Sequence, residues 1–276
     1  MRAQRHAPVS SIWEKGRIMK FTGKNITIGK TVSIGEKVKI GDNTIIYDNV
    51  VIRDNTIICN DCVIGEPTNS YYYDEGYENP PTILGADSLI RSHAIIYAGT
   101  KISDHFTSGH RIIIREKTTM GHHCSVGTLC DIQGYSTFGN YCRLHSSVHI
   151  GQNSRVGNFV FIYPYAAFLN DPTPPSNTVI GPKIGDFSQV GASSVVFPGI
   201  MVGENCLVAA GSVVNKDVAS FSVVAGNPAR FLCRIEAVRS REKDGSHYPW
   251  MLHYEKGMPW AGCGYQEWIK QTTTKP

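Results

Sequence analysis

The sequence predicts an all-β chain folded mainly as a parallel β-helix of about nine triangular coils. Two observations carry this prediction. Apolar residues occupy 27 of 28 positions spaced six residues apart in three blocks, where an apolar content of 41% would place only about 11. A smaller residue stands four positions after most of them, so two residues remain for a turn before the next strand.

The six-residue step defines both strands and corners. Two inward side chains separated by two positions fit a short strand, because successive side chains alternate between its faces. The residues between strands tolerate left-handed backbone, as in Asp42-Asn43, Asp48-Asn49 and Asn60-Asp61. Three strands and three corners bring the chain back above its start after 18 residues. Ser108 is the one polar residue at an inward six-residue position.

Composition and charge exclude several classes of protein. With 41% hydrophobic and 18% charged residues, a disordered chain is excluded. A net charge of +4 is mild for nucleic-acid binding but suits an anionic small ligand. No apolar stretch reaches the roughly 20 residues of a membrane span, and the basic N-terminus lacks a secretory apolar core. We therefore expect a cytoplasmic protein with reduced cysteines, no membrane contact and no nucleic-acid partner.

Four segments depart from the repeat, which is assigned to residues 21–228. Residues 1–20 are predicted to be a leader or cap. The segment 66–82 has four tyrosines and three prolines, and its rings either contact a sugar or base or pack on the outer wall or a neighbouring subunit. The segment 169–182 contains four prolines and is predicted to be an extruded loop. Residues 229–276 hold three of the four tryptophans and are predicted to be a helical, aromatic cap over the open edge, with ligand contact as the alternative.

The segment 184–232 resembles the left-handed β-helix acyltransferases that use acyl-coenzyme A, and the left hand of the helix is implied by this resemblance. The segment FTSGHRIIIRE around His110 is similar to a Thr-Gly-His segment of nucleotide-sugar N-acyltransferases. Asn170-Asp171-Pro172 is similar to the start of a loop that, in such enzymes, folds over the cofactor and a neighbouring subunit's site. The resemblance implies acetyl-CoA or another acyl-CoA as co-substrate.

Candidate site residues follow from the repeat and the resemblance together. Seven of the ten histidines lie between residues 93 and 149. His93, His105 and His123 fall at a left-handed turn position and have a structural explanation. His110 and His145 are the candidate catalytic residues. We expect substrate contacts from the following residues: Tyr72, Tyr73, Arg115, Asn170 and Asp171.

The coenzyme is expected along one corner of the coil. If the loop 169–182 leaves the coil at a single corner, small residues at two upper turns stack above His145 and His110. Their exposed backbone would bind a pantetheine arm, while Lys216 and Arg230 would meet the phosphates. The residues expected to bind the cofactor are Gly191, Ala192, Ala209, Ala210, Gly211, Lys216 and Arg230. No metal is expected.

These observations favour transfer of an acyl group, normally acetyl, from acyl-CoA to the amine of a nucleotide-linked amino-deoxy sugar. A thymidine-diphosphate amino-dideoxyhexose is favoured as acceptor by resemblance. The first alternative is an O-acetyltransferase acting on a sugar or serine hydroxyl. The others are a γ-class zinc carbonic anhydrase, whose histidine spacing does not match, and a non-catalytic β-helix subunit. Outward apolar residues such as Ile45, Val51, Ile57 and Val63 favour a homotrimer.

Overall fold

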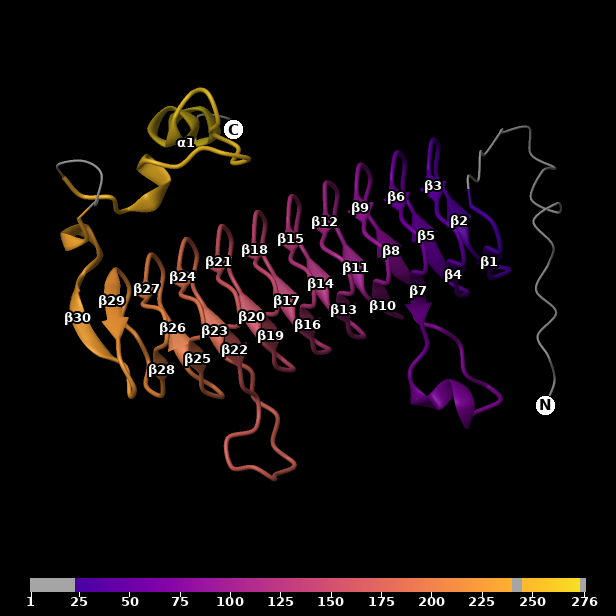
Figure 1. The fold of residues 1–276 in the computed structure, drawn as a ribbon, viewed down its shortest axis with the longest axis horizontal. Helices are drawn as coiled ribbons and strands as arrows, with labels where there is room; N and C mark the ends of the chain where they lie inside the picture. Colours follow the sequence, from indigo (N-terminus) through magenta and orange to yellow (C-terminus); the bar gives the residue numbers. More distant parts are fainter. Residues whose placement is uncertain (1–22, 240–244, 274–276) are drawn as a thin grey trace.

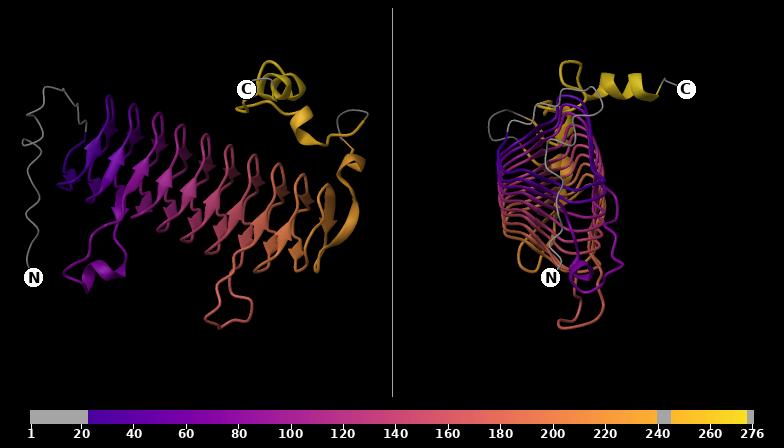
Figure 2. Two further views of the ribbon diagram at one scale, coloured as in Figure 1. Left: turned by 180° about the vertical axis from the view of Figure 1, so that it is seen from behind. Right: turned by 90° about the vertical axis from the view of Figure 1, so that its right-hand side faces the viewer.

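The computed structural model describes residues 23–239 and 245–273, and within them the chain is a left-handed parallel β-helix with three long sheets (Figures 1 and 2). The predicted leader at residues 1–20 lies outside the described residues. Sheet A contains β1 (Thr27–Ile28), β4 (Ile45–Ile46), β7 (Val63–Glu66), β10 (Ile95–Tyr97), β13 (Ile113–Ile114), β16 (Asp131–Ile132), β19 (His149–Ile150), β22 (Ala167–Phe168), β25 (Val195–Val196) and β28 (Val213–Val214). Sheet B contains β2 (Ser33–Ile34), β5 (Val50–Ile52), β8 (Thr82–Leu84), β11 (Lys101–Ile102), β14 (Thr119–Met120), β17 (Thr137–Phe138), β20 (Arg155–Val156), β23 (Lys183–Ile184) and β26 (Met201–Val202). Sheet C contains β3 (Lys39–Ile40), β6 (Ile57–Ile58), β9 (Leu89–Ile90), β12 (Thr107–Ser108), β15 (Ser125–Val126), β18 (Arg143–Leu144), β21 (Phe161–Ile162), β24 (Gln189–Val190), β27 (Leu207–Val208), β29 (Ser222–Ala225) and β30 (Arg230–Arg234).

The six-residue period is confirmed strand by strand. Each of the 28 inward positions falls in one of the strands β1 to β28, and uninterrupted coils pair residues 18 apart, as in Asp131 with His149. The inward aliphatic side chains form one continuous buried core. Ser108, the polar exception, is also buried, and its hydroxyl accepts a hydrogen bond of 2.8 Å from the Arg91 amide. A polar side chain is tolerated in this core because it is hydrogen-bonded.

The corners adopt the backbone that their residue types predict. The φ angles of His93, His105 and His123 are 63°, 61° and 58°, as in Asn and Asp residues of the same turn position. This left-handed conformation is open to His, Asn and Asp. The three histidines therefore have the structural role expected of them.

The coil count is slightly higher than the nine predicted, because the sheets contain 10, 9 and 11 strands. The additional strands follow β28, where the six-residue period is lost. Val218 bridges Val202 of sheet B, β29 then stacks in parallel on β27, and β30 returns antiparallel to β29. The predicted boundary between coil and cap at residue 229 falls between the last two strands.

Two loops leave the coil where sheet A leads to sheet B. Residues 66–82 connect β7 to β8 and include the 3-10 helix η2 (Asn69–Tyr72), and residues 169–182 connect β22 to β23. Both loops project from the same edge of the prism in Figure 1. The two loops therefore mark one corner, the A–B corner, at two different heights.

The C-terminal segment returns along the side of the coil. Beyond η3 (Ile235–Ala237), residues 245–273 include η4 (Trp250–Leu252) and helix α1 (Tyr265–Thr273). Trp260 is fully buried against Phe159 at the B–C corner, and the Trp250 indole donates a 2.8 Å hydrogen bond to the Phe187 carbonyl. The aromatic residues thus cover a corner of the prism, while β29 and β30 extend its end. Among the described residues, no helix has the length and apolar character needed to cross a membrane.

Candidate active site

The triangular cross-section separates the candidate residues into two groups. Turns from sheet C to sheet A form the C–A corner, which includes residues 109–112, 127–130, 145–148, 163–166, 191–194 and 209–212. Both candidate catalytic histidines and the small-residue turns lie on this corner. The candidate substrate residues lie at the A–B corner, which is opposite sheet C. Within one chain, the two groups are therefore on different edges of the prism.

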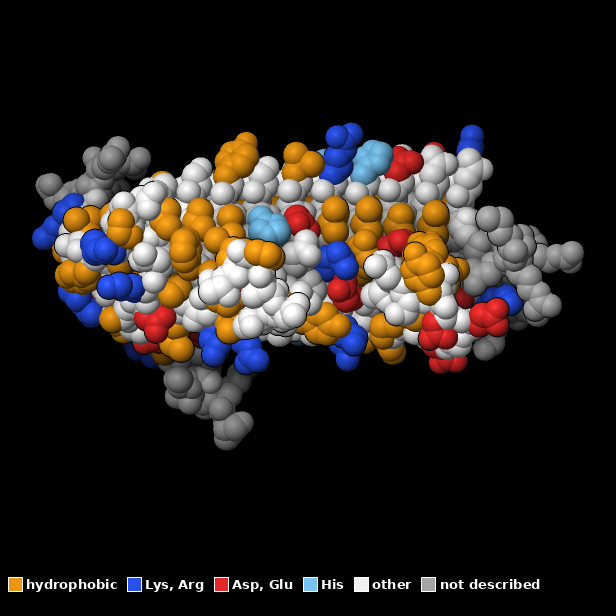
Figure 3. Space-filling view, turned by 90° about the horizontal axis from the view of Figure 1, so that it is seen from below, with side chains coloured by type: hydrophobic (Ala, Val, Ile, Leu, Met, Phe, Trp, Pro, Cys, Tyr) orange, Lys and Arg blue, Asp and Glu red, His pale blue; other side chains and the backbone are white. Residues whose placement is uncertain are grey.

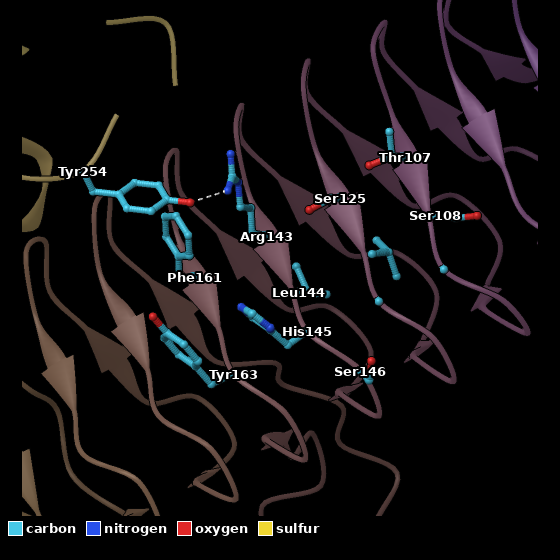
Figure 4. A pocket seen from close by; sticks show the side chains of 13 residues that line it. Thr107, Ser108, Ser125, Arg143, Leu144, His145, Ser146, Phe161, Tyr163 and Tyr254 are labelled. Atoms are coloured by element: carbon cyan, nitrogen blue, oxygen red, sulfur yellow. Dashed lines mark hydrogen bonds between the residues drawn. The ribbon is translucent and has the colours of Figure 1, made fainter. Parts of the chain in front are cut away.

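A pocket of about 510 Å³ lies on the outer face of sheet C beside the C–A corner, and we call it the C-face pocket (Figure 4). Successive strands β12, β15, β18 and β21 present their outward residues to it: Thr107, Ser125, Arg143 and Phe161. His145 and Ser146 line it from the corner, and Tyr254 reaches it from the C-terminal segment. The pocket therefore combines hydroxyl groups, a guanidinium group, an imidazole and aromatic rings.

His145 is the candidate catalytic residue that lines this pocket. Its ring stacks on Tyr163 with centroids 4.9 Å apart and an angle of 10° between the planes, as Figure 4 shows. Partial burial is the larger cause that lowers the pKa of His145, and the positive charge of Arg143 lowers it further. A lowered pKa keeps the imidazole neutral at neutral pH. His145 is therefore able to accept a proton.

His110 lies on the same corner, two coils closer to the N-terminus. Its side chain is exposed and does not line the C-face pocket, although the preceding Gly109 does. The His110 amide donates a 3.2 Å hydrogen bond to the hydroxyl of Thr128, one coil above. The two candidate histidines thus share a corner column, and only one of them reaches the pocket.

The upper part of the C–A corner has unpaired backbone donors. Some turn amides lower on this corner donate to the side chain 18 residues ahead, as Asp42 does to Asn60 Oδ1 at 3.0 Å, while those of Ser92 and Thr128 have no hydrogen-bond partner among the described residues. The residue above Ser146 is Pro164 and the residue above Ala192 is Ala210, and neither side chain contains an acceptor. In the described part of the chain, the amides of Ser146, Ala192 and Ala210 have no hydrogen-bond partner. An extended ligand can bind these amides without breaking an internal bond.

The small-residue turns stack above the turn of His145, as expected if the loop 169–182 leaves the coil at a single corner: the Ser193 amide donates to the Pro164 carbonyl at 2.9 Å, and the Tyr165 amide to the Ser146 carbonyl at 3.3 Å. The Gly191 amide donates to the Val208 carbonyl at 2.8 Å, and the Gly211 amide to the Ala192 carbonyl at 2.8 Å. A Cβ atom on Gly191 would lie 2.5 Å from the Ala210 nitrogen, so only glycine allows this approach. Gly211 has a φ of 70°, which favours glycine.

The two candidate phosphate-binding residues lie at different corners. Arg230 begins β30 opposite Ala225 and donates to the Ala229 carbonyl at 2.8 Å, close to the turn at 209–212 on the C–A corner. Lys216 is exposed between β28 of sheet A and the bridge of Val218 to sheet B, and therefore lies at the A–B corner. Only Arg230 lies at the corner with the small residues.

The tyrosine-rich loop exposes Tyr72 and Tyr73, whose side chains are 62% and 90% accessible. Their neighbour Tyr71 packs edge-on against Tyr47 of the coil, with centroids 6.1 Å apart. Arg115 lies on the same corner, pairs with Glu116 at 2.7 Å and stacks over the Tyr97 ring at 4.6 Å. The charge of Arg115 is therefore already compensated within the chain.

The second loop uses one of its candidate residues internally. The Asp171 carboxylate accepts hydrogen bonds from the Thr173 amide at 3.1 Å and from the amide and hydroxyl of Ser176 at 2.9 and 2.6 Å. The hydroxyl bond is the main cause that lowers the pKa of Asp171. The Asn170 carbonyl accepts from the Ile180 amide at 2.8 Å. Asp171 thus stabilises the loop conformation.

Other polar groups were not identified from the sequence. On the outer face of sheet A, the His149 ring lies 3.1 Å from an Asp131 carboxylate oxygen, and Gln133 donates to the same carboxylate at 2.9 Å. Tyr254 and Arg143 of the C-face pocket were also missed. The 18-residue spacing would have placed Arg143 in line with Thr107 and Ser125, whereas no repeat marks Tyr254.

The histidines at the B–C corner form a ring stack. His105 and His123 are parallel with centroids 4.4 Å apart, and the stack continues through Tyr141 to Phe159. Across residues 23–239 and 245–273, no three His, Cys, Asp or Glu side chains gather as a metal-binding group.

Comparison with known proteins agrees with this architecture. The family model "Bacterial transferase hexapeptide (six repeats)" matches residues 37–68, and "Hexapeptide repeat of succinyl-transferase" matches residues 183–216. The Arabidopsis UDP-N-acetylglucosamine acyltransferase structure superposes with a TM-score of 0.63 at 16% identity, covering 76% of this chain and 73% of that chain. At this identity the likeness shows the fold alone.

Two curated relatives match short segments. Serine acetyltransferase 2 of Arabidopsis thaliana is 51% identical over 51 residues, which are 18% of this chain and 16% of that protein. The 2,3,4,5-tetrahydropyridine-2,6-dicarboxylate N-acetyltransferase of Staphylococcus aureus (strain JH9) is 37% identical over 71 residues, which are 26% of this chain and 29% of that protein. The matches thus span less than a third of these relatives. The chain therefore has a hexapeptide repeat and the left-handed β-helix fold, and short segments of it are similar to acetyltransferases.

Proposed function

We propose that this protein transfers an acyl group, normally acetyl, from acyl-CoA to the amine of a nucleotide-linked amino-deoxy sugar. The observation that carries the proposal is the C–A corner, where unpaired amides at Ala192 and Ala210 lead down to Ser146 and His145 in the C-face pocket. A thioester arm bound along these amides ends beside a polar pocket with room for an acceptor. The matched segments of two acetyltransferases support the same reaction class.

The chemistry needs a proton acceptor and a donor to the developing oxyanion. The sugar amine attacks the thioester carbonyl, the C–S bond breaks, and the excess proton moves to a histidine. His145 is suited to this role because its lowered pKa keeps it neutral, and His110 remains the second candidate. The unpaired Ser146 amide is a donor available for the oxyanion.

The residues at the upper turns fit a slim, polar arm. Gly191 lets the next turn approach closely, Gly211 leaves open space beside the corner, and Ala192, Ala209 and Ala210 add only methyl groups. Arg230, at the same corner, would bind a coenzyme A phosphate, and Lys216 would need a neighbouring chain to bring it there. Acyl-CoA supplies the activated acyl group when bound.

A homotrimer would bring the separated groups together. Tyr72, Tyr73, Arg115, Asn170 and Asp171 lie at the A–B corner and reach a C–A corner only in another protomer. The outer face of sheet A carries an apolar row, which Figure 3 shows beside the two loops, and it contains Ile45, Val63, Ile95 and Ile113. Such a row favours burial against a partner. Sedimentation velocity tests this assembly, since a monomer at micromolar concentration contradicts shared sites.

O-acetyl transfer to a sugar or serine hydroxyl is the second candidate, because a segment of this chain is 51% identical to a serine acetyltransferase over 51 residues. A hydroxyl needs deprotonation during attack, whereas a sugar amine is partly neutral at neutral pH. Loss of the base therefore costs more in O-transfer than the usual roughly 10²- to 10⁴-fold effect.

The test is release of coenzyme A from acetyl-CoA in the presence of a thymidine-diphosphate 3-amino- or 4-amino-dideoxyhexose, compared with serine. We expect acetylated amino sugar as the product. The double variant His110→Ala, His145→Ala separates the mechanisms. If the double variant retains most of the activity, both the O-transfer hypothesis and the general-base role fail. If the unaltered protein acetylates only serine, the amino-sugar proposal fails.

A further inference from the structure

The C-terminal segment is tied to the coil through Arg143. This residue points outward from β18, and its guanidinium donates to the Tyr254 hydroxyl at 2.8 Å, the Lys256 carbonyl at 2.7 Å and the Gly257 carbonyl at 3.1 Å. The partners are 111 to 114 residues away in the sequence. Arg143 therefore fixes the position of the chain around Tyr254 relative to the floor of the C-face pocket.

Tyr254 is also held through its own backbone. The indole of Trp260, which is fully buried, donates a 2.8 Å hydrogen bond to the Tyr254 carbonyl. The Tyr254 ring packs edge-on against Phe161, with centroids 5.8 Å apart and an angle of 90° between planes. Because backbone, ring and hydroxyl oxygen are each held, the hydroxyl occupies a defined place at the rim of the pocket.

The Tyr254 hydroxyl donates no hydrogen bond to any described residue. Its oxygen accepts from Arg143, and no described residue accepts the phenolic hydrogen. Figure 4 shows Tyr254 and Arg143 on one side of the pocket, with Ser125 and Thr107 on the neighbouring strands. Hydroxyl donors beside the partly exposed Tyr163 ring, one face of which stacks on His145, match a sugar ring, which has both oxygens and an apolar C–H face.

We propose that Tyr254 donates its phenolic hydrogen to an oxygen of the acceptor sugar in the C-face pocket, and that Arg143 is the positioning residue that orients it. This inference rests on the proposed function, because it takes the acceptor to be a nucleotide-linked sugar. It makes the C-terminal segment a determinant of acceptor affinity, with no direct part in binding the acyl donor.

The test is calorimetric binding of thymidine-diphosphate glucose, which has no amine and cannot react. Loss of one neutral hydrogen bond weakens binding about threefold to tenfold, so Tyr254→Phe should raise the Kd by this factor and leave the Kd for acetyl-CoA unchanged. The matched control is Tyr265→Phe, which removes a hydroxyl from the same aromatic segment outside the C-face pocket. We expect this control to bind both ligands as the unaltered protein does.

A double-mutant cycle with Arg143→Lys tests the positioning role. If Arg143 acts through the Tyr254 hydroxyl, Arg143→Lys weakens sugar binding in the unaltered protein and adds little in the Tyr254→Phe background. Additive effects overturn the positioning role, and a Tyr254→Phe protein that binds normally overturns the whole inference. If the unaltered protein binds acetyl-CoA but no thymidine-diphosphate glucose, the proposed acceptor class fails and this inference fails with it.

Discussion

Substituting Pro164 tests whether the unpaired amide of Ser146 serves catalysis. In this corner, an Asn placed 18 residues ahead accepts the turn amide, as Asn60 does from Asp42 at 3.0 Å. Pro164→Asn therefore introduces an acceptor directly above Ser146 and occupies its N–H. Pro164→Ala is the matched control, because it removes the proline ring without adding an acceptor.

The expected size of the effect follows from the role of the amide. Removing one oxyanion donor lowers kcat about 10²- to 10³-fold, so Pro164→Asn should lose this factor relative to Pro164→Ala. Both variants lose the proline constraint on the unfolded chain, so each should be destabilised by only about 0.4–1 kcal/mol. Steady-state kinetics on both variants, with thermal unfolding as the check on folding, gives the comparison. Equal kcat values in the two variants would refute the role of the Ser146 amide.

Three further outcomes are expected. Burial and the Arg143 charge lower the pKa of His145, so activity should fall as the pH drops through that pKa. Arg143→Gln removes the second cause and should move the acidic limb of the pH–kcat profile to higher pH. If the limb does not move, the base is another residue. Trp260→Ala removes a fully buried side chain and should cost about 3–5 kcal/mol in the docking of the C-terminal segment, seen as faster hydrogen exchange there while the coils keep their protection. Gly191→Ala should weaken acetyl-CoA binding, measured by calorimetry, because the added Cβ would lie 2.5 Å from the Ala210 nitrogen and would force the two turns apart. Unchanged affinity would show that the coenzyme does not bind at this corner.

The coil was predictable because its information is local and repeated. Each inward residue needs only a neighbour 18 residues away, so the period predicted the sheets, the core and the corner columns, including the left-handed conformation of His105. The position of Gly191 above the turn of His145 needed the further assumption that the loop 169–182 leaves the coil at a single corner. The number of coils was underestimated at the end of the β-helix, where the period is lost. After β28 the spacing is irregular: β29 lies inside the predicted coil of residues 21–228 but outside its six-residue positions, and β30 lies in the predicted cap.

The candidate site was predictable only in part. The repeat places His145 on the C–A corner, where the C-face pocket lies. Lys216 was predicted to act with the small residues of that corner, but it follows β28 of sheet A and lies at the A–B corner. Tyr254 was not predicted, because its position depends on how a non-repetitive segment docks on Arg143, more than a hundred residues earlier. Asp171 was taken for a ligand contact on a motif, while its carboxylate has three donors in its own loop.

Because the C-terminal segment returns along the prism, the β-helix and the C-face pocket are completed at different times during synthesis. Coils can stack one on the next as they leave the ribosome, since each needs only the coil before it. The wall formed by Tyr254 closes over strands completed about 110 residues earlier. A nascent chain therefore has a finished β-helix before it has a finished C-face pocket, so a product that ended before Tyr254 would keep its coils and lack one wall of that pocket.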